Sequence, residues 1–264
     1  MAKVYHHEIY GLRETKYDWL NKHHIKNVKW NKLEPQSEFY LFIPQDQKMF
    51  KIYKTFKNIT DIFPVNSVGI VTARDALTIG WNEDEIWNRV QNFARLEIEL
   101  ARQTYQLGED TRDWKVEFAQ KDLKESGIDK NHLTPILYRP FDVRYTYYTG
   151  KSRGFHCRPR SDVMRHMLEP NNSLCFMRQV STSGSYTQVL ISEHMVDNRT
   201  FFSSKGIIQQ APLYLYPETD KKDLFSEHET GEKKPNIKLE LFEELKKNYK
   251  KEVTPEEIFY YIYA

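Results

Sequence analysis

The densest chemistry in this sequence is a run of cations between Tyr138 and Arg165. The run holds seven basic side chains, and only Asp142 and Asp162 oppose them. Arginine and lysine pair with phosphate, and the planar guanidinium can also donate two hydrogen bonds to guanine. The run predicts a surface for an anionic polymer, although the whole chain carries a formal charge of only +2. Its cations are Arg139, Arg144, Lys151, Arg153, Arg158, Arg160 and Arg165.

Two later segments, FMRQVSTSGSYTQ and NRTFFSSKG, hold more polar side chains of the kind that read base edges. We therefore expect two sets of DNA-binding residues. The set near phosphates or a groove is Lys151, Arg153, Arg158, Arg160 and Arg165. The set at base edges is Arg178, Gln179, Thr182, Ser183, Ser203, Ser204 and Lys205.

Local features of the run support this hypothesis. Gly150 and Gly154 would let the backbone approach another surface closely. Ser161 is expected to cap a short helix whose free N–H groups suit an anion. The alternative interpretation is that Arg139 and Arg144 pair with local carboxylates and that the other cations are solvated. The RPFD stretch fits either case, because Asp142 can pair with Arg139 or Arg144 inside the protein, and Arg74 and Arg112 also have the pattern of structural residues.

Motifs for catalysis are missing from the sequence. The chain has no GxGxxG, GxxxxGK[ST], GxSxG or HExxH pattern. The pairs His6-His7 and His23-His24 are adjacent in sequence, so each pair points in divergent directions. Neither Cys157 nor Cys175 belongs to a CxxC pattern, and we expect both to be reduced thiols. We therefore predict no catalytic residue, no metal site and no cofactor in this chain.

Short strands and helices must position these side chains. Strands are predicted at FYLFI (39–43), SVGIV (67–71), ILYRPFDVRYTYYT, SLCFMRQV, TQVLI and APLYLY. A long helix should begin at Asn82, with Glu85 completing a capping box, and end at Gly108. A second helix should cover Trp114 to Ser126. A short helix capped by Ser161 should turn Val163, Met164, Met167 and Leu168 inward.

These elements predict an α+β fold, with a mixed or antiparallel sheet, flanking helices and a helical C-terminal tail. We expect a recognition domain over 1–216, composed of a part with two helices (1–130) and a β-rich part (131–216). A charged linker should cover 217–238 and a helical segment 239–264. In that last segment Phe259, Tyr260, Tyr261 and Tyr263 should be exposed, as if the chain were cut from something longer.

Composition limits the location of the protein. No apolar run approaches the roughly 18–20 residues that a membrane span needs, and the N-terminus lacks the apolar stretch of a secretory signal. With 29% charged residues, the chain is expected to be soluble and cytoplasmic, without a membrane partner.

The segments LTPILYRPFDVRYTYYT, SRGFHCRPRSDVMRHML and APLYLYPE resemble the C-terminal specificity region of Type ISP restriction–modification enzymes. The upstream stretches EIYGLRETKYDWL, EFYLFIP, ITDIFPVNSVGIVTARD and DTRDWK are similar to that region in the same order, and so is the closing PEEIFYYIYA. The resemblance covers nearly the whole chain.

The resemblance implies a role inside a larger enzyme. Members of the family are single polypeptides with a nuclease, a helicase-type ATPase, an N6-adenine methyltransferase and then a target recognition domain. This chain would be that last part, which reads duplex DNA and positions an adenine for the methyltransferase of the same polypeptide. S-adenosylmethionine, ATP and Mg²⁺ would then belong to the parent enzyme, and this fragment would not be catalytic. The alternative is a protein–protein interaction module that uses the exposed aromatics of the closing helix.

Overall fold

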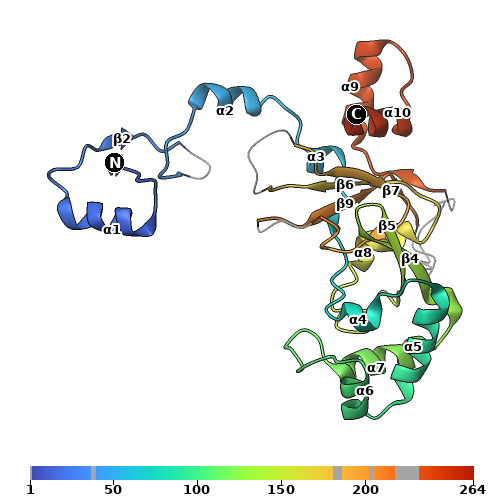
Figure 1. Ribbon diagram of the computed structural model, residues 1–264. Coiled ribbons are helices and arrows are strands. Elements are labelled where there is room, and N and C mark those ends of the chain that lie inside the picture. Colours follow the sequence, from blue (N-terminus) through green and yellow to red (C-terminus); the bar gives the residue numbers. More distant parts are fainter. Residues whose placement is uncertain (1, 37–39, 181–185, 202–204, 218–231) are drawn as a thin grey trace. The chain divides into compact units, whose positions relative to one another are not determined.

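The computed structural model describes residues 2–36, 40–180, 186–201, 205–217 and 232–264. The chain forms two compact units, Met1–Lys57 and Asn58–Ala264, and each is described by itself (Figure 1). The predicted segments 1–216, 217–238 and 239–264 stay a prediction, and much of the middle one lies outside the described residues.

The first unit has no buried core among its described residues. Strand β1 (Val4–His6) pairs antiparallel with β2 (Asn31–Leu33), and helices α1 (Arg13–Lys22) and α2 (Gln47–Tyr53) complete it. None of its described residues is buried.

The buried strand predicted at 39–43 is wrong over residues 40–43, and Phe39 lies outside the described residues. Residues 40–43 form no strand, and their side chains are 42–65% exposed. No described strand pairs with them and no core covers them, so an apolar run alone is not enough to make a strand.

The second unit contains a four-stranded antiparallel sheet in the order β3-β9-β6-β7. Its strands are β3 (Ser67–Val68), β6 (Ser173–Met177), β7 (Val189–Ser192) and β9 (Ile208–Pro212). Strand β6 is buried along its whole length, as expected for a central strand. The predicted strand at 67–71 is shorter than expected, because the chain leaves β9 after Val68, and Ile70 and Val71 form isolated bridges with Asp197 and Arg158 instead.

A second, three-stranded sheet has the order β5-β4-β8. Strands β4 (Leu133–Arg139) and β5 (Asp142–Tyr147) form an antiparallel hairpin, and β8 (Met195–Val196) runs parallel to β4. One antiparallel and one mixed sheet, with helices beside them, confirm the α+β class.

Helices cover the hairpin. They are α4 (Asp75–Thr78), α5 (Glu83–Arg95), α6 (Ile98–Thr104) and α7 (Val116–Ser126), and their apolar faces share a core with Tyr147 and Phe155. The single helix predicted to run to Gly108 is wrong, because Leu96 is extended and the Glu97 side chain starts a new helix by accepting from two backbone N–H groups. Helix α7 ends at Gly127 as predicted.

The chain closes with helices α9 (Leu239–Tyr249) and α10 (Pro255–Tyr263). They pack with α3 (Ile59–Ile62) in another apolar core. Tyr214, from the small ladder of β10 (Tyr214–Leu215) and β11 (Lys234–Pro235), also packs against this core. Thr254 and Glu257 form a complete capping box. The prediction that Phe259 is exposed is wrong: its ring is buried against Phe63, with ring centroids 6.0 Å apart.

The other aromatics of α10 behave as predicted. Tyr260, Tyr261 and Tyr263 are exposed. Over the whole described part of the chain, no helix combines the length and the apolar character that crossing a membrane requires.

Candidate nucleic-acid interface

The basic loop at residues 149–160 is fixed to the body of the second unit by one buried carboxylate. Asp122, on the inner side of α7, accepts hydrogen bonds from the Phe155 N–H and the Thr149 hydroxyl, both at 2.7 Å. The Ser126 hydroxyl donates to its other oxygen at 2.9 Å. A Cβ at Gly154 would lie 2.2 Å from the Asp122 carboxylate. Gly154 is therefore required for packing inside the protein, and its expected role in approaching a ligand is wrong.

The loop alternates between core and surface. Phe155 is fully buried, and its carbonyl accepts from the indole N–H of Trp114 at 3.2 Å. Its neighbours Lys151 and Arg153 on one side and Arg158 on the other are exposed. A loop that is anchored at its centre holds these cations in fixed places, because its backbone cannot move without exposing Phe155.

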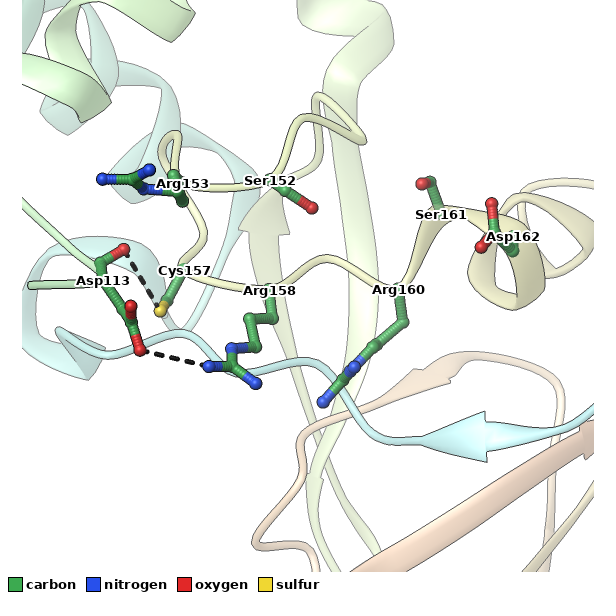
Figure 2. Close-up of a pocket in the computed structure, with 8 residues that line it drawn as sticks. All are labelled: Asp113, Ser152, Arg153, Cys157, Arg158, Arg160, Ser161 and Asp162. Atoms are coloured by element: carbon green, nitrogen blue, oxygen red, sulfur yellow. Dashed lines mark hydrogen bonds and ion pairs between the residues drawn. The ribbon is translucent and has the colours of Figure 1, made fainter.

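Three arginines of the loop, Arg153, Arg158 and Arg160, line a pocket of about 290 Å³ (Figure 2). Arg158 and Arg160 flank Pro159, and their side chains point to the same side. Arg158 binds the Asp113 carboxylate at 3.1 Å and is half exposed. The pocket is lined by Asp113, Ser152, Arg153, Cys157, Arg158, Arg160, Ser161 and Asp162.

Arg160 is the least satisfied group of the pocket. Its Nε is buried and has no hydrogen-bond partner in the described part of the protein. Burial lowers the pKa of the Arg160 guanidinium, and the Arg158 charge lowers it further. An anion placed between the two guanidinium groups would supply an acceptor and relieve their repulsion.

The short helix after Arg160 is close to its prediction. Helix α8 (Ser161–Met164) and a 3₁₀ turn (Arg165–Met167) bury Val163, Met164 and Met167. Ser161 is the first helical residue and not the cap, because Arg160 occupies that position in a left-handed conformation. Leu168, expected to face inward, is exposed, since the turn that carries it is no longer α-helical.

The remaining cations of the loop have partners in the protein. Lys151 pairs with Glu125 at 3.5 Å. The guanidinium of Arg153 lies over the Phe118 ring, 5.0 Å from its centroid, and donates to the Arg112 carbonyl. Arg153 and Lys151 also line a second hollow of about 270 Å³ next to α7.

Arg165 lies at another place. Its guanidinium donates to the Tyr216 carbonyl at 3.0 Å, and the Tyr216 N–H donates to His166. Tyr216 follows β10, which comes directly after the end of β9. That end of β9 pairs with the first residue of β6, so Tyr216 and Arg165 lie at the end of the sheet where β6 begins. Arg178 and Gln179 follow the last residue of β6, so the sheet separates them from Arg165.

Arg178, Gln179 and Lys205 meet at one end of the sheet. All three are exposed, and Gly206, next to Lys205, packs so closely that its Cβ would lie 2.2 Å from the Gln179 carbonyl. Their neighbours in the prediction, Thr182, Ser183, Ser203 and Ser204, lie outside the described residues.

Residues 69–71 connect this end of the sheet to the pocket. The Gly69 N–H donates to the Ile208 carbonyl at the start of β9, and Val71 exchanges backbone hydrogen bonds with Arg158. Two residues of extended chain span at most about 7 Å. The described backbone at Gly206–Ile208, beside Gln179, and the backbone of Arg158 are therefore neighbours around a short extended segment.

The RPFD stretch is structural in its charged residues. Arg144 binds Asp142 with both nitrogens, the closest contact being 2.9 Å, which confirms the internal ion pair. Arg139 binds the buried Asp197 at 2.9 Å. Arg74 donates to three backbone carbonyls and lies over the Trp114 ring, so its predicted structural role is confirmed.

Sequence reasoning missed the acidic residues of the site. Asp113 pairs with Arg112 and Arg158, which lower its pKa, and Asp162 lines the pocket. In the sequence, Asp122 looks the same as the solvated carboxylates on the other predicted helices. Its one signal was its place beside the apolar stripe of Val116, Ala119 and Leu123.

The pocket is lined by one thiol, that of Cys157. Cys157 donates to the Asp113 carbonyl at 3.5 Å, and burial raises the pKa of its thiol. Among the residues with described positions, no three His, Cys, Asp or Glu side chains are grouped closely enough to hold a metal ion. The arrangement can bind anions by charge and hydrogen bonding.

Comparison with known proteins places most of the chain in one family. A sequence model described as the Type ISP C-terminal specificity domain matches residues 61–264. A search of curated proteins finds no match.

Solved structures share the fold. The structure of a DrdV–DNA complex is similar with a TM-score of 0.64 at 19% identity, and the match covers 99% of this chain and 26% of that one. A nuclease-deletion mutant of the Type ISP restriction-modification enzyme LlaGI, in complex with a DNA substrate mimic, has a TM-score of 0.55 at 20% identity. That match covers 89% of this chain and 23% of that one. The ATP-dependent Type ISP restriction-modification enzyme LlaBIII bound to DNA has a TM-score of 0.56 at 16% identity. That match covers 89% of this chain and 15% of that one. The chain thus spans a quarter or less of the length of most of these proteins.

Proposed function

Since the chain belongs to the family of Type ISP C-terminal specificity domains, we propose that it recognises a short sequence in duplex DNA on behalf of a larger restriction–modification enzyme. The observation that carries the proposal is the pair Arg158 and Arg160, which line one open pocket and lie close enough for their like charges to repel each other. A DNA phosphate is an acceptor of the charge and size that this pair needs.

Recognition would divide between two neighbouring groups of residues. Contacts from Arg158, Arg160 and Arg153 to phosphates would set the register of the duplex without reading its sequence. Arg178, Gln179 and Lys205, with Thr182, Ser183, Ser203 and Ser204, would contact base edges in the major groove. Lys151 would contribute charge from the rim, and Arg165, on the far side of the sheet, would contact DNA only if the duplex extends around it.

The purpose of recognition would be to deliver an adenine to the methyltransferase of the same polypeptide. An adenine must leave the base stack to reach a methyl donor, which costs a few kcal/mol. Contacts that form only on the correct sequence would offset that cost. S-adenosylmethionine, ATP and Mg²⁺ would act in other parts of the parent enzyme, and this chain would contribute binding without catalysis.

The salt dependence of duplex binding tests the proposal. We expect the 264-residue chain to bind a labelled duplex at low salt, with micromolar or weaker affinity and a steep loss as salt rises. The triple change Arg153→Ala, Arg158→Ala and Arg160→Ala should reduce the slope of log K against log salt by up to about 2.7, since each lost phosphate contact contributes about 0.9.

A control variant separates local contact from net charge. Lys246→Ala, Lys247→Ala and Lys251→Ala remove the same charge from the exposed side of the closing helices. That variant should keep most of the slope of the unchanged chain. Equal slopes for the unchanged chain and the arginine variant would remove the pocket from the interface, and a chain that retains no duplex at low salt would favour the protein-interaction alternative.

A further inference from the structure

The turn between β4 and β5 carries the most exposed large apolar side chain in the described part of the protein. Phe141 is 91% exposed, and its φ is +63°. Bulky residues rarely adopt this left-handed conformation, which glycine and asparagine accept much more easily. The sequence thus places a large apolar ring where both solvation and backbone conformation disfavour it, and such outliers concentrate at functional positions.

The structure beneath Phe141 holds this turn rigidly. The Arg144 guanidinium lies between the rings of Trp81 and Tyr138, 3.8 Å and 4.4 Å from their centroids, and Asp142 binds it from the side. On the other strand, Arg139 lies 3.7 Å from the centroid of the Tyr138 ring and binds Asp197. Two ion pairs and a stack of alternating rings and guanidinium groups therefore fix the hairpin just below its tip.

The hairpin lies beside the predicted DNA surface. Asp197, the partner of Arg139, neighbours Asn198, whose N–H donates to the Ile70 carbonyl. The next residue along, Val71, pairs with Arg158. The part of the hairpin near its tip, where Arg139 binds Asp197, and the Arg158–Arg160 pair thus flank the same extended segment from two sides, about two strand spacings or roughly 10 Å apart.

From this placement we propose that Phe141 is a wedge that enters the base stack of the bound duplex. The inference rests on the proposed function. A base step that opens accepts one flat or apolar side chain, and proteins that kink DNA insert phenylalanine in this way. The exposed apolar side chains at this turn are Phe141, Trp81 and Val143, set among ion-paired arginines. This patch is small for a protein interface, where apolar contacts extend over a wide area. A wedge next to the recognition surface would help to unstack an adenine.

Duplexes with a disrupted stack provide the test. The 264-residue chain is titrated at low salt with a labelled, fully paired duplex and with the same duplex carrying a central tandem mismatch. If Phe141 acts as a wedge, the chain should bind the mismatched duplex about tenfold more tightly than the paired one, because the mismatch already meets part of the cost of unstacking. Phe141→Asn should lose this preference and bind both duplexes as the unchanged chain binds the paired one. Its melting temperature should stay the same or rise, because asparagine tolerates the left-handed turn.

A matched control is Tyr261→Asn, which removes another strongly exposed ring from the same unit and should keep the preference. Binding of both duplexes without a preference, or a preference that survives Phe141→Asn, would overturn the wedge and leave the proposed function standing. Failure of the unchanged chain to bind either duplex would overturn both.

Discussion

Replacing Asp122 by alanine removes the acceptor of three hydrogen bonds that fix the basic loop to α7. The Phe155 N–H is buried and would be left without an acceptor, which costs roughly 1–3 kcal/mol. The hydrogen bonds of the Thr149 and Ser126 hydroxyls together contribute only roughly 1 kcal/mol more, because both groups lie near solvent and regain hydrogen bonds to water. We therefore expect Asp122→Ala to lower the free energy of unfolding by roughly 2–4 kcal/mol.

Urea and thermal unfolding, followed by circular dichroism, measure this change. For a unit of this size each kcal/mol lowers the melting temperature by about 2–4 °C, so the expected decrease is roughly 4–16 °C. The duplex affinity of the folded variant should also fall, because the loop that holds Arg153 and Arg158 loses its anchor. The slope with salt should change little, since no cation is removed.

Glu117→Ala is the matched control, because Glu117 is an exposed carboxylate on the same helix. It should change the free energy of unfolding by no more than about 0.5 kcal/mol. If Asp122→Ala and Glu117→Ala have the same stability, the reasoning about the anchor of the loop is refuted.

Two further predictions concern stability. Burial raises the pKa of Asp197 to about 6, so this carboxyl binds a proton more tightly in the folded than in the unfolded state. The stabilisation from this proton is complete below about pH 4. As the pH rises to 6, the free energy of unfolding should fall by up to about 3 kcal/mol. Urea unfolding between pH 4 and 7 should show this loss in the unchanged chain, and Asp197→Asn should flatten it; an equal slope in both would contradict the assignment. Thr254→Ala should lower the free energy of unfolding by about 0.5–2 kcal/mol, because it removes the capping box of α10; a melting temperature identical to that of Thr254→Ser would show that the cap adds nothing.

Elements with local signals could be predicted from the sequence. The capping residues Thr254 and Glu257 determine the start of α10, Gly127 determines the end of α7, and the central strand β6 follows from its apolar run. These features depend on neighbours along the chain, so spacing alone reveals them.

Features that depend on distant residues could not be predicted. FYLFI has the composition of a strand, but no described strand pairs with residues 40–43. Phe259 is buried in a core formed by residues that are distant in sequence, among them Phe63 and Phe176. The cation run has the composition of one patch, yet the fold pairs Arg139 with Asp197 and sends Arg165 to the opposite end of the sheet. Only Arg158 and Arg160, with Arg153 nearby, remain together at the pocket.

The central claim, that DNA binds at the Arg158–Arg160 pair, is tested most directly by arginine modification. The chain is treated with phenylglyoxal with and without a saturating duplex, and modified arginines are located by mass spectrometry. We expect bound duplex to protect Arg158 and Arg160 from modification, while the exposed Arg95 on α5 reacts as it does without DNA. Equal reactivity of Arg158 and Arg160 with and without bound DNA would contradict it.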